Sequence, residues 1–423
     1  MLIAGEASGD LLAAELVFAL RAKVSASESE PTNDVQPLRT ELASKFFGAG
    51  GPRMAAAGVE LAFDLTKHSV IGISEVLKKY LEFRRLFNQL LKLAIERQPD
   101  AIIGVDYGGF NLRFGHAIRQ HIRAHRNQFN NWNPKIVQFV SPQVWASRPK
   151  RAYQIAEDYD LLLSIFPFEK DWYARRVPKL RVEFVGHPMV GRFQKADSGQ
   201  RTAETLAALT QILLLPGSRA DEVRRHLPML LDTLQLIQEK LPAVTAKIIL
   251  PNNDALASSV AWEFIRRLGI RVRLSGPLTF ASAQGFARKY NPGLELQAGN
   301  LSEALANADL AITKSGTITM ECAMFGVPAV VFYKTSWPTY VIGRQIVTVK
   351  YLAMPNLLAD APIYPEFIQH AATPKKISQA ALEILRDPAR RQSVETRLAE
   401  IVKSLGGPGA AARAADAIVS LLK

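Results

Sequence analysis

The chain has 423 residues, of which 48% are hydrophobic and 22% are charged, and its formal net charge is +13. This composition excludes a disordered or fibrous protein, and the single cysteine (Cys322) excludes a disulfide framework. No run of apolar residues reaches the roughly 20 that a membrane span requires. The charge favours anionic partners, but Lys and Arg are spread along the chain without a nucleic-acid-binding motif, so we expect no nucleic-acid partner.

The first half of the chain alternates short apolar strands with helical patterns. That rhythm predicts a parallel, doubly wound α/β sheet. Residues 25–38 are poor in apolar side chains and are expected to form a surface insertion. The expected strands are 2–4, 46–48, 101–105, 136–140, 161–165 and 183–185.

Residues 75–93 form a basic helical pattern. Apolar residues recur at helical spacing, and Phe83 and Leu86 are left over on other faces. A helix with more apolar surface than one core stripe needs can lie on an anionic membrane, but a core helix with a solvated basic face explains the pattern equally well. The basic residues are Lys78, Lys79, Arg84 and Arg85.

A polar stretch, residues 194–201, separates the first set of strands from a second set. We therefore expect two domains, residues 1–193 and 202–403, followed by an amphipathic C-terminal helix at 404–423 that could pack on either one. The second set of strands is 212–215, 246–250, 272–275, 310–312 and 329–333.

A strand–turn–helix segment in the second half has the pattern of an anion site. The strand 310–312 leads through a Ser-Gly-Thr turn, residues 315–317, into a short helix that Gly326 and Pro328 end. Ser315 and Thr317 can cap this helix, and Gly316 lets the backbone approach a ligand. The helix amides and the charge of Lys314 favour an anion such as a nucleotide diphosphate.

A second segment of this kind lies upstream, at residues 211–225. Its strand ends in a Pro-Gly turn, and Ser218 precedes Asp221 by three residues, which is the spacing of a helix N-cap followed by an acid. Arg219 then projects from the first turn of the helix. Ligands bind beyond the carboxyl ends of parallel strands, so the two loops suggest one shared crevice, although ordinary capped helices would explain each loop alone.

Several motifs, in one order along nearly the whole chain, resemble those of the lipid-A-disaccharide synthase family. The motifs are GEASGD (5–10), GAGGPRM (48–54), VIGISEVL (70–77), SPQVWA (141–146), FPFEKDWY (166–173), FVGHP (184–188), LPGSR (215–219), SGT (315–317) with Glu321, and MPNLLA (354–359).

This resemblance implies a GT-B-type inverting glycosyltransferase with two Rossmann-like domains facing each other across a cleft. It implies that UDP-2,3-diacylglucosamine is joined to 2,3-diacylglucosamine 1-phosphate, with release of UDP and without a cofactor or a metal ion. The resemblance also implies a cytoplasmic localisation, with the protein bound peripherally to the anionic inner face of the cytoplasmic membrane.

Asp106 is the candidate for the catalytic base. It ends the buried strand 101–105 and is followed by glycines, and the family's proposed catalytic aspartate stands at the matching position. An aspartate that caps its own loop through Asn111 or a backbone amide is the alternative. Glu6 and Ser8, in the first glycine loop, are expected near the acceptor, and His187 is expected to touch phosphate, to shuttle protons or to support the domain junction.

The expected donor site lies in the C-terminal half. Glu321 follows the SGT turn by one helical turn, which suits a carboxylate that bridges ribose hydroxyls, although a surface salt bridge would explain it too. The other expected UDP-sugar contacts are Ser218, Arg219, Lys314, Ser315, Gly316, Thr317, Asn356 and Gln369.

Two residues depart from the family pattern. Gly108 stands where the family often has a proline, and Ser147 stands where it usually has a tryptophan. These departures keep a non-catalytic UDP-sugar or lipid-binding protein open, and a sugar-nucleotide epimerase of the same fold is the other alternative.

Overall fold

A computed structural model describes residues 1–28, 46–68, 76–192, 210–251, 259–263, 265, 270–275 and 289–423. It divides the chain into two compact units, Met1–Arg192 with Leu405–Lys423, and Phe193–Ser404. Most of the expected insertion, the whole expected linker and residues 70–75 of one family motif lie outside the described residues.

The first unit contains a parallel seven-stranded sheet in the order β3-β2-β1-β4-β5-β6-β7. The central strands are buried on both faces because their apolar runs are covered by helices on both sides. The chain order reverses between β1 and β4, which makes this edge a topological switch point. The strands are β1 Leu2–Ala4, β2 Phe47–Gly50, β3 Glu60–Asp64, β4 Ala101–Val105, β5 Lys135–Phe139, β6 Leu161–Ser164 and β7 Arg181–Phe184; the α-helices are α1 Ala7–Glu28, α2 Pro52–Ala56, α3 Val76–Arg97, α4 Gly108–His125, α5 Arg151–Asp158 and α6 Pro167–Ala174.

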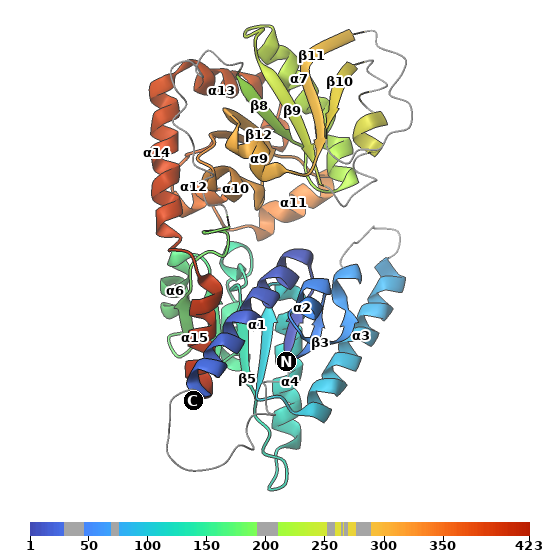
Figure 1. The fold of residues 1–423 in the computed structure, drawn as a ribbon, viewed down its shortest axis with the longest axis vertical. Coiled ribbons are helices and arrows are strands. Elements are labelled where there is room, and N and C mark those ends of the chain that lie inside the picture. The colour runs from blue at the N-terminus through green and yellow to red at the C-terminus, as the bar shows by residue number, and fades with distance from the viewer. Residues whose placement is uncertain are drawn as a thin grey trace. The chain divides into compact units, whose positions relative to one another are not determined.

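The second unit repeats this architecture with the order β10-β11-β9-β8-β12-β13-β14, again parallel throughout (Figure 1). Its switch point lies between β8 and β12, the two strands that precede the predicted anion loops. The strands are β8 Gln211–Leu215, β9 Thr245–Leu250, β10 Ile270–Ser275, β11 Lys289–Ala298, β12 Leu310–Lys314, β13 Ala329–Tyr333 and β14 Glu366–Ile368; the α-helices are α7 Ala220–Gln238, α9 Leu301–Ala306, α10 Ile318–Met324, α11 Trp337–Ile346, α12 Met354–Ala359, α13 Pro374–Arg386 and α14 Pro388–Ser404.

The predicted fold class, two Rossmann-like α/β sheets, is confirmed. The sequence prediction missed β3, β11 and β14. Each of these strands lies at or next to the edge of its sheet.

The C-terminal helix α15, Ala410–Leu422, packs against α1 of the first unit (Figure 1). Lys23 pairs with Asp416 at 2.7 Å, and the guanidinium of Arg413 donates to the carbonyl oxygens of Val185, Gly407 and Pro408 at 2.7–2.8 Å. These bonds tie the end of the chain to the loop after β7. The sequence prediction treated residues 404–423 as a separate part, whereas the structure includes Leu405–Lys423 in the first unit.

Candidate functional site

Asp106 and Ser8 meet at the switch point of the first unit. Strands β1 and β4 are paired, with Ala4 opposite Val105, so the loops that follow them lie side by side. The Asp106 carboxylate accepts a hydrogen bond from the Ser8 side chain and one from the Tyr107 amide. The sheet thus places the first glycine loop and the loop after β4 at one edge.

The backbone at Asp106 is held in an unusual shape. Asp106 and Tyr107 both have left-handed conformations, with φ of 51° and 46°, which cost about 1–3 kcal/mol each in residues other than glycine. The side-chain amides of Asn111 and Gln138 each donate to the Asp106 carbonyl oxygen at 2.8 Å and hold this shape. Asn111 is therefore a positioning residue. It binds the main chain of Asp106 and not its carboxylate, so Asp106 does not cap its loop through Asn111, whereas the Tyr107 amide does bind the carboxylate, as the capping alternative allowed.

The electrostatic environment makes Asp106 a stronger base than an ordinary aspartate. Burial raises the pKa of its carboxyl group, and the hydrogen bonds from Tyr107 and Ser8 only partly oppose this effect. A carboxylate with a raised pKa accepts a proton more readily.

Tyr107 was missed by the sequence prediction. Its ring covers Gly5 so closely that a Cβ at that position would lie 2.2 Å from the ring, which explains the first glycine of GEASGD. Burial and the nearby Glu6 carboxylate raise the pKa of the Tyr107 hydroxyl. Glu6 is exposed beside it, so Glu6, Ser8, Tyr107 and Asp106 form one cluster at this edge.

Asp10, the last residue of GEASGD, has a structural role. Its carboxylate accepts hydrogen bonds from the amides of Gly51, Arg53 and Met54 at 2.8–3.0 Å. These bonds fasten the start of α1 to the GAGGPRM loop after β2. The two motifs are thus halves of one local structure.

His187 does not join the Asp106 cluster. It follows β7, three strands from β4 in the sheet, which corresponds to about 14 Å at ordinary strand spacing. The ring is buried against Phe166, and its Nδ1 accepts a bond from the Met189 amide at 3.3 Å. Burial, and then the charge of Arg192, lower the pKa of His187 to about 4, so the ring is neutral at neutral pH and acts as a structural support.

The two predicted anion loops of the second unit are joined by an ion pair. Lys314, at the end of β12, lies 2.6 Å from the Oε1 atom of Glu222 in the first turn of α7. The other oxygen of Glu222 accepts from the Ser218 amide at 2.9 Å. The predicted shared edge therefore exists, but the charge of Lys314 is paired and does not act alone.

The helix caps differ from the predicted ones. Helix α7 begins at Ala220 with Arg219 as its N-cap residue, and Glu222 takes the amide bond that the Ser218 and Asp221 spacing had suggested. Burial favours the protonated form of Glu222. This effect is outweighed by the hydrogen bond and the charge of Lys314 and by hydrogen bonds from the amides of Ser218 and Arg219, so the pKa of Glu222 is lowered. The Ser218 prediction was wrong as a cap, because α7 begins one residue later than expected and its N-cap position is taken by Arg219, without a side-chain cap bond.

Arg219 is the exposed cation of this edge. Among the described residues it pairs with no acidic side chain, and it flanks Gly217, whose φ of 127° needs a glycine. It is therefore free to bind an anion from solution.

The SGT turn is open to solvent at Gly316 and Thr317. Gly316 has a φ of 139°, a backbone shape that other residues rarely adopt, and the Thr319 hydroxyl donates to its carbonyl oxygen at 2.8 Å. Neither Ser315 nor Thr317 caps α10 with its side chain, contrary to the prediction, and the Ser315 amide donates to Phe332 in the sheet.

Glu321 lies one turn into α10 and is largely buried without an ion pair among the described residues. Burial raises its pKa from 4.5 to about 6. A buried carboxylate that lacks a cation is well suited to accept hydrogen bonds from hydroxyl groups of a ligand.

Asn356 and Gln369 hold segments of the second unit in place. Asn356 is fully buried, and its amide bonds to both backbone groups of Tyr364 and to Glu366 at 2.7–2.8 Å. Gln369 bonds to the amide and the carbonyl of Thr335. These bonds give both residues a supporting role, and a direct contact with the donor stays a prediction.

His226 is a supporting residue that the sequence prediction missed. It is buried on α7, with Nδ1 2.6 Å from the Pro216 oxygen and Nε2 3.0 Å from the Lys334 oxygen. It thereby links the loop after β8 to the segment after β13. No group of three or more His, Cys, Asp or Glu side chains in the described part of the chain is arranged to hold a metal ion.

Comparison with known proteins gives consistent matches over the full length. The family model for lipid-A-disaccharide synthetase matches residues 1–263 and 283–418. The lipid-A-disaccharide synthases of Syntrophus aciditrophicus and Myxococcus xanthus are 32% and 33% identical, each over 100% of this chain and 97% of the relative.

Solved structures with the same fold are far more distant in sequence. The glycosyltransferase of kitacinnamycin aligns with a TM-score of 0.56 at 18% identity, covering 100% of this chain and 98% of the other. The UDP-GlcNAc 2-epimerase from Neisseria meningitidis aligns with a TM-score of 0.51 at 11% identity, with the same coverage. At such identities the likeness concerns the fold alone.

The raised pKa of Glu321 predicts a pH-dependent stability. Because the folded pKa of about 6 lies above 4.5, the folded state holds the proton more tightly, and stability falls as the pH rises through this window. We expect Glu321→Gln to gain about 2 kcal/mol in free energy of unfolding, relative to the wild type, between pH 4.5 and pH 7. Urea unfolding at both pH values measures this difference.

Glu303→Gln, on the exposed face of α9, is the matched control and should follow the wild type at both pH values. A Glu321→Gln difference that does not change with pH would contradict the assignment.

Proposed function

This chain belongs to the lipid-A-disaccharide synthase family, and from that membership we propose how its residues carry out the transfer. The protein is a UDP-sugar-dependent glycosyltransferase of lipid A biosynthesis. The observation that carries this conclusion is the match over the whole chain, which includes both switch-point edges. The reaction joins UDP-2,3-diacylglucosamine to 2,3-diacylglucosamine 1-phosphate.

We assign the acceptor to the Asp106 cluster of the first unit. Asp106 takes the proton of the acceptor's 6-hydroxyl while that oxygen forms a bond to the anomeric carbon of the donor. The bond from the anomeric carbon to the diphosphate breaks in the same displacement, so the configuration inverts. Ser8 orients the carboxylate, Asn111 and Gln138 hold its loop, and Glu6 contacts acceptor hydroxyls.

We assign the donor to the edge between β8 and β12. The departing UDP carries negative charge, which Arg219 and the exposed backbone of the SGT turn stabilise. Lys314 contributes a partly neutralised charge and keeps the two loops together through Glu222. Ser218, Ser315 and Thr317 are assigned to the diphosphate, and Glu321 is assigned to the ribose hydroxyls.

An epimerase gains no support from the fold likeness. The similarity to the Neisseria enzyme is 11% in sequence, whereas the matches to lipid-A-disaccharide synthases exceed 30% over the full length. The fold itself does not separate the two classes, because a putative UDP-N-acetylglucosamine 2-epimerase from Listeria monocytogenes and the kitacinnamycin glycosyltransferase both align with a TM-score of 0.56.

We further propose that α3 contacts the anionic inner face of the cytoplasmic membrane, because both substrates carry acyl chains. Arg84, Arg85 and Lys92 are exposed along one face of α3, beside Leu81, whose exposed fraction is 62%. None of the described helices is both long and apolar enough to cross a bilayer. The contact would therefore be peripheral.

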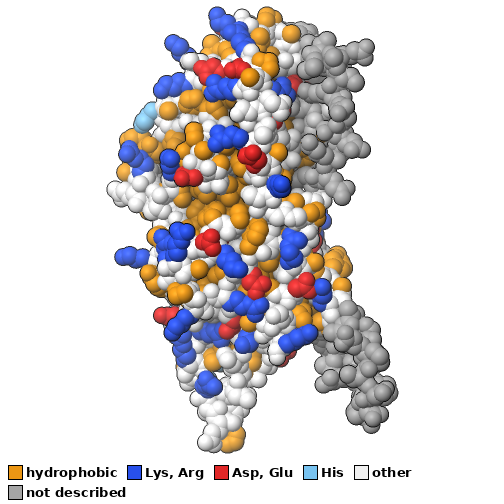
Figure 2. Space-filling view, turned by 90° about the vertical axis from the view of Figure 1, so that its left-hand side faces the viewer, with side chains coloured by type: hydrophobic (Ala, Val, Ile, Leu, Met, Phe, Trp, Pro, Cys, Tyr) orange, Lys and Arg blue, Asp and Glu red, His pale blue; other side chains and the backbone are white. Residues whose placement is uncertain are grey.

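The apolar surface of α3 is smaller than its sequence suggested. Phe83 and Leu86 are half-buried against the core, so Leu81 remains as the exposed large apolar residue among the described side chains of this helix. Figure 2 shows the face on the left of Figure 1, where Lys and Arg side chains are spread among acidic ones; α3 is drawn on the right of Figure 1. With one exposed large apolar residue among the described side chains of α3, attraction to anionic lipid would depend on local charges such as Arg84 and Arg85.

Asp106→Asn tests the proposed base. The variant keeps the shape of the side chain but cannot accept a proton, so we expect kcat to fall by about 10² or more while KM changes little. The rate of the wild type should fall as the pH drops through the raised pKa of Asp106, and the variant should lack this acidic limb. Release of UDP from the two diacylglucosamine substrates measures both effects.

Asp100→Asn, at the opposite end of β4, is the matched control and should keep normal turnover. Normal turnover in a folded Asp106→Asn variant would refute the role of Asp106. Absence of any transfer by the wild type would refute the function itself.

Charge reversal tests the membrane contact. Each basic residue near an anionic surface contributes about 1 kcal/mol to binding, so Arg84→Glu with Arg85→Glu should weaken binding to phosphatidylglycerol vesicles by at least about tenfold. Co-sedimentation measures the bound fraction, with phosphatidylcholine vesicles as the neutral reference.

The control is Arg123→Glu with Arg126→Glu, an exposed pair near the end of α4 that carries the same change of charge. Equal losses in both double variants would indicate a general charge effect and would contradict a specific contact through α3.

A further inference from the structure

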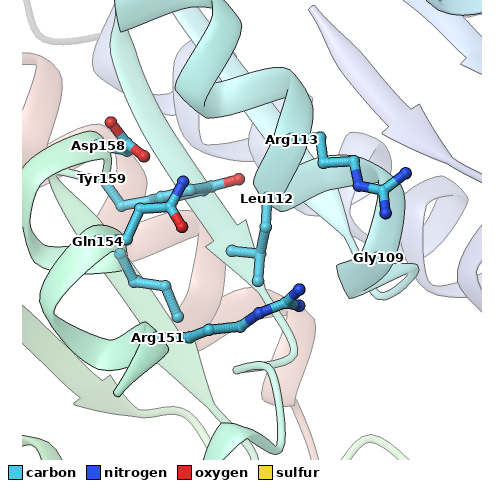
Figure 3. Close-up of a pocket in the computed structure, with 8 residues that line it drawn as sticks. Gly109, Leu112, Arg113, Arg151, Gln154, Asp158 and Tyr159 are labelled. Atoms are coloured by element: carbon cyan, nitrogen blue, oxygen red, sulfur yellow. The ribbon is translucent and has the colours of Figure 1, made fainter. Parts of the chain in front are cut away.

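A small cavity lies between α4 and α5 in the first unit (Figure 3). Its volume is about 50 Å³, which is room for roughly three to five water molecules, or for the oxygens of one phosphate group. Its polar lining includes Arg113 from α4, with Arg151, Gln154 and Asp158 from α5. The proposed reaction has so far used none of these residues.

The arginines around this cavity lack carboxylate partners. Arg113 and Arg151 line it, and Arg148 lies close enough to act on Arg151; within the described residues none of the three forms an ion pair. Burial, and then the charges of Arg148 and Arg113, lower the pKa of Arg151. Some other arginines of this unit do have acidic partners, as Arg119 has Asp160 and Arg192 has Glu15.

One acid, Asp158, lines the cavity, but it already has a partner. Its Oδ2 atom lies 2.9 Å from Nδ1 of His116, and the residue is only 1% exposed. Two arginines therefore line the cavity beside one buried carboxylate, whose Oδ2 atom contacts a histidine and whose Oδ1 atom has no hydrogen-bond partner in the described part of the chain. A guanidinium group without an acidic partner is available to an oxyanion, which can accept two hydrogen bonds from its fork of donors.

The cavity lies close to the proposed base. Gly109, in the first turn of α4, lines it and follows Asp106 by three residues, a length of chain that spans at most about 11 Å. In a pyranose the 1-position and the carbon that bears the 6-position both flank the ring oxygen, so a 1-phosphate and the 6-hydroxyl lie within the width of one sugar ring. A phosphate on carbon 1 can therefore occupy the cavity while the 6-hydroxyl reaches Asp106.

We propose that this cavity, with Arg113 and Arg151, binds the phosphomonoester of the acceptor sugar. This inference rests on the proposed function and adds a determinant of specificity to it. The arginines hold the acceptor by its phosphate, and they thereby set which end of the sugar faces the base. An acceptor without the phosphate lacks this contact and binds less tightly.

A set of variants assayed with two acceptors tests the proposal. One acceptor is 2,3-diacylglucosamine 1-phosphate and the other is the same sugar without its phosphate. A lost charge-assisted bond should lower kcat/KM for the phosphorylated acceptor by about tenfold or more in Arg113→Gln and in Arg151→Gln. The value for the dephosphorylated acceptor should stay within about twofold of the wild type.

Arg151→Lys and Arg123→Gln are the companion variants. Arg151→Lys keeps the charge and should recover part of the preference for phosphate. Arg123→Gln removes one exposed charge from the same helix, α4, and should behave as the wild type. Circular dichroism and thermal unfolding establish that each variant is folded.

The outcomes distinguish failure of the proposed phosphate site from failure of the proposed glycosyltransferase function. Equal losses with both acceptors would assign Arg113 and Arg151 a structural role and overturn the proposal. Transfer by the wild type to both acceptors with equal efficiency would overturn it as well, and would leave the glycosyltransferase function intact. Absence of transfer to either acceptor would remove the function on which the proposal rests.

An anionic lipid headgroup is the other source of a phosphate. If Arg151→Gln loses binding to phosphatidylglycerol vesicles but keeps the preference between the two acceptors, the cavity is a lipid site and the acceptor assignment is wrong.

Discussion

The constraint on which both sites depend is the reversal of strand order in two parallel sheets. In a parallel sheet the carboxyl ends of neighbouring strands share one edge, and where the order reverses the flanking helices leave to opposite faces. This geometry brings Ser8 to Asp106 beside β1 and β4, and Glu222 to Lys314 across 92 residues beside β8 and β12. Segments that are remote in the sequence thus become neighbours because of the strand order.

The two edges have opposite electrostatic characters, which suits opposite ends of one reaction. In the first unit a partly buried carboxylate is made more basic by desolvation. In the second unit Arg219 is exposed and unpaired among the described residues, while Lys314 is tied to Glu222. The ion pair partly neutralises the positive charge of Lys314, but it fixes the two loops relative to each other. Under the proposed donor assignment, loops fixed in this way would reorganise little when UDP leaves.

The sequence predicted those parts of the site that depend on local patterns. The apolar run 101–105 followed by Asp106 indicates a strand that ends in an acid, and the SGT turn indicates a strand–turn–helix junction. It could not predict features that depend on distant partners. The left-handed shape of Asp106 needs the amide of Gln138, the pairing of Lys314 needs Glu222, and the docking of α15 needs the carbonyl of Val185. An amphipathic pattern reveals a buried face but does not identify its partner.

The central claim is that the edge between β8 and β12 holds the diphosphate of the donor. The most direct test is the affinity for UDP, measured by titration calorimetry on the wild type, Arg219→Ala and Arg225→Ala, an exposed arginine of the same helix. The account predicts that Kd rises about tenfold or more for Arg219→Ala and stays unchanged for Arg225→Ala. Unchanged affinity in Arg219→Ala would contradict it.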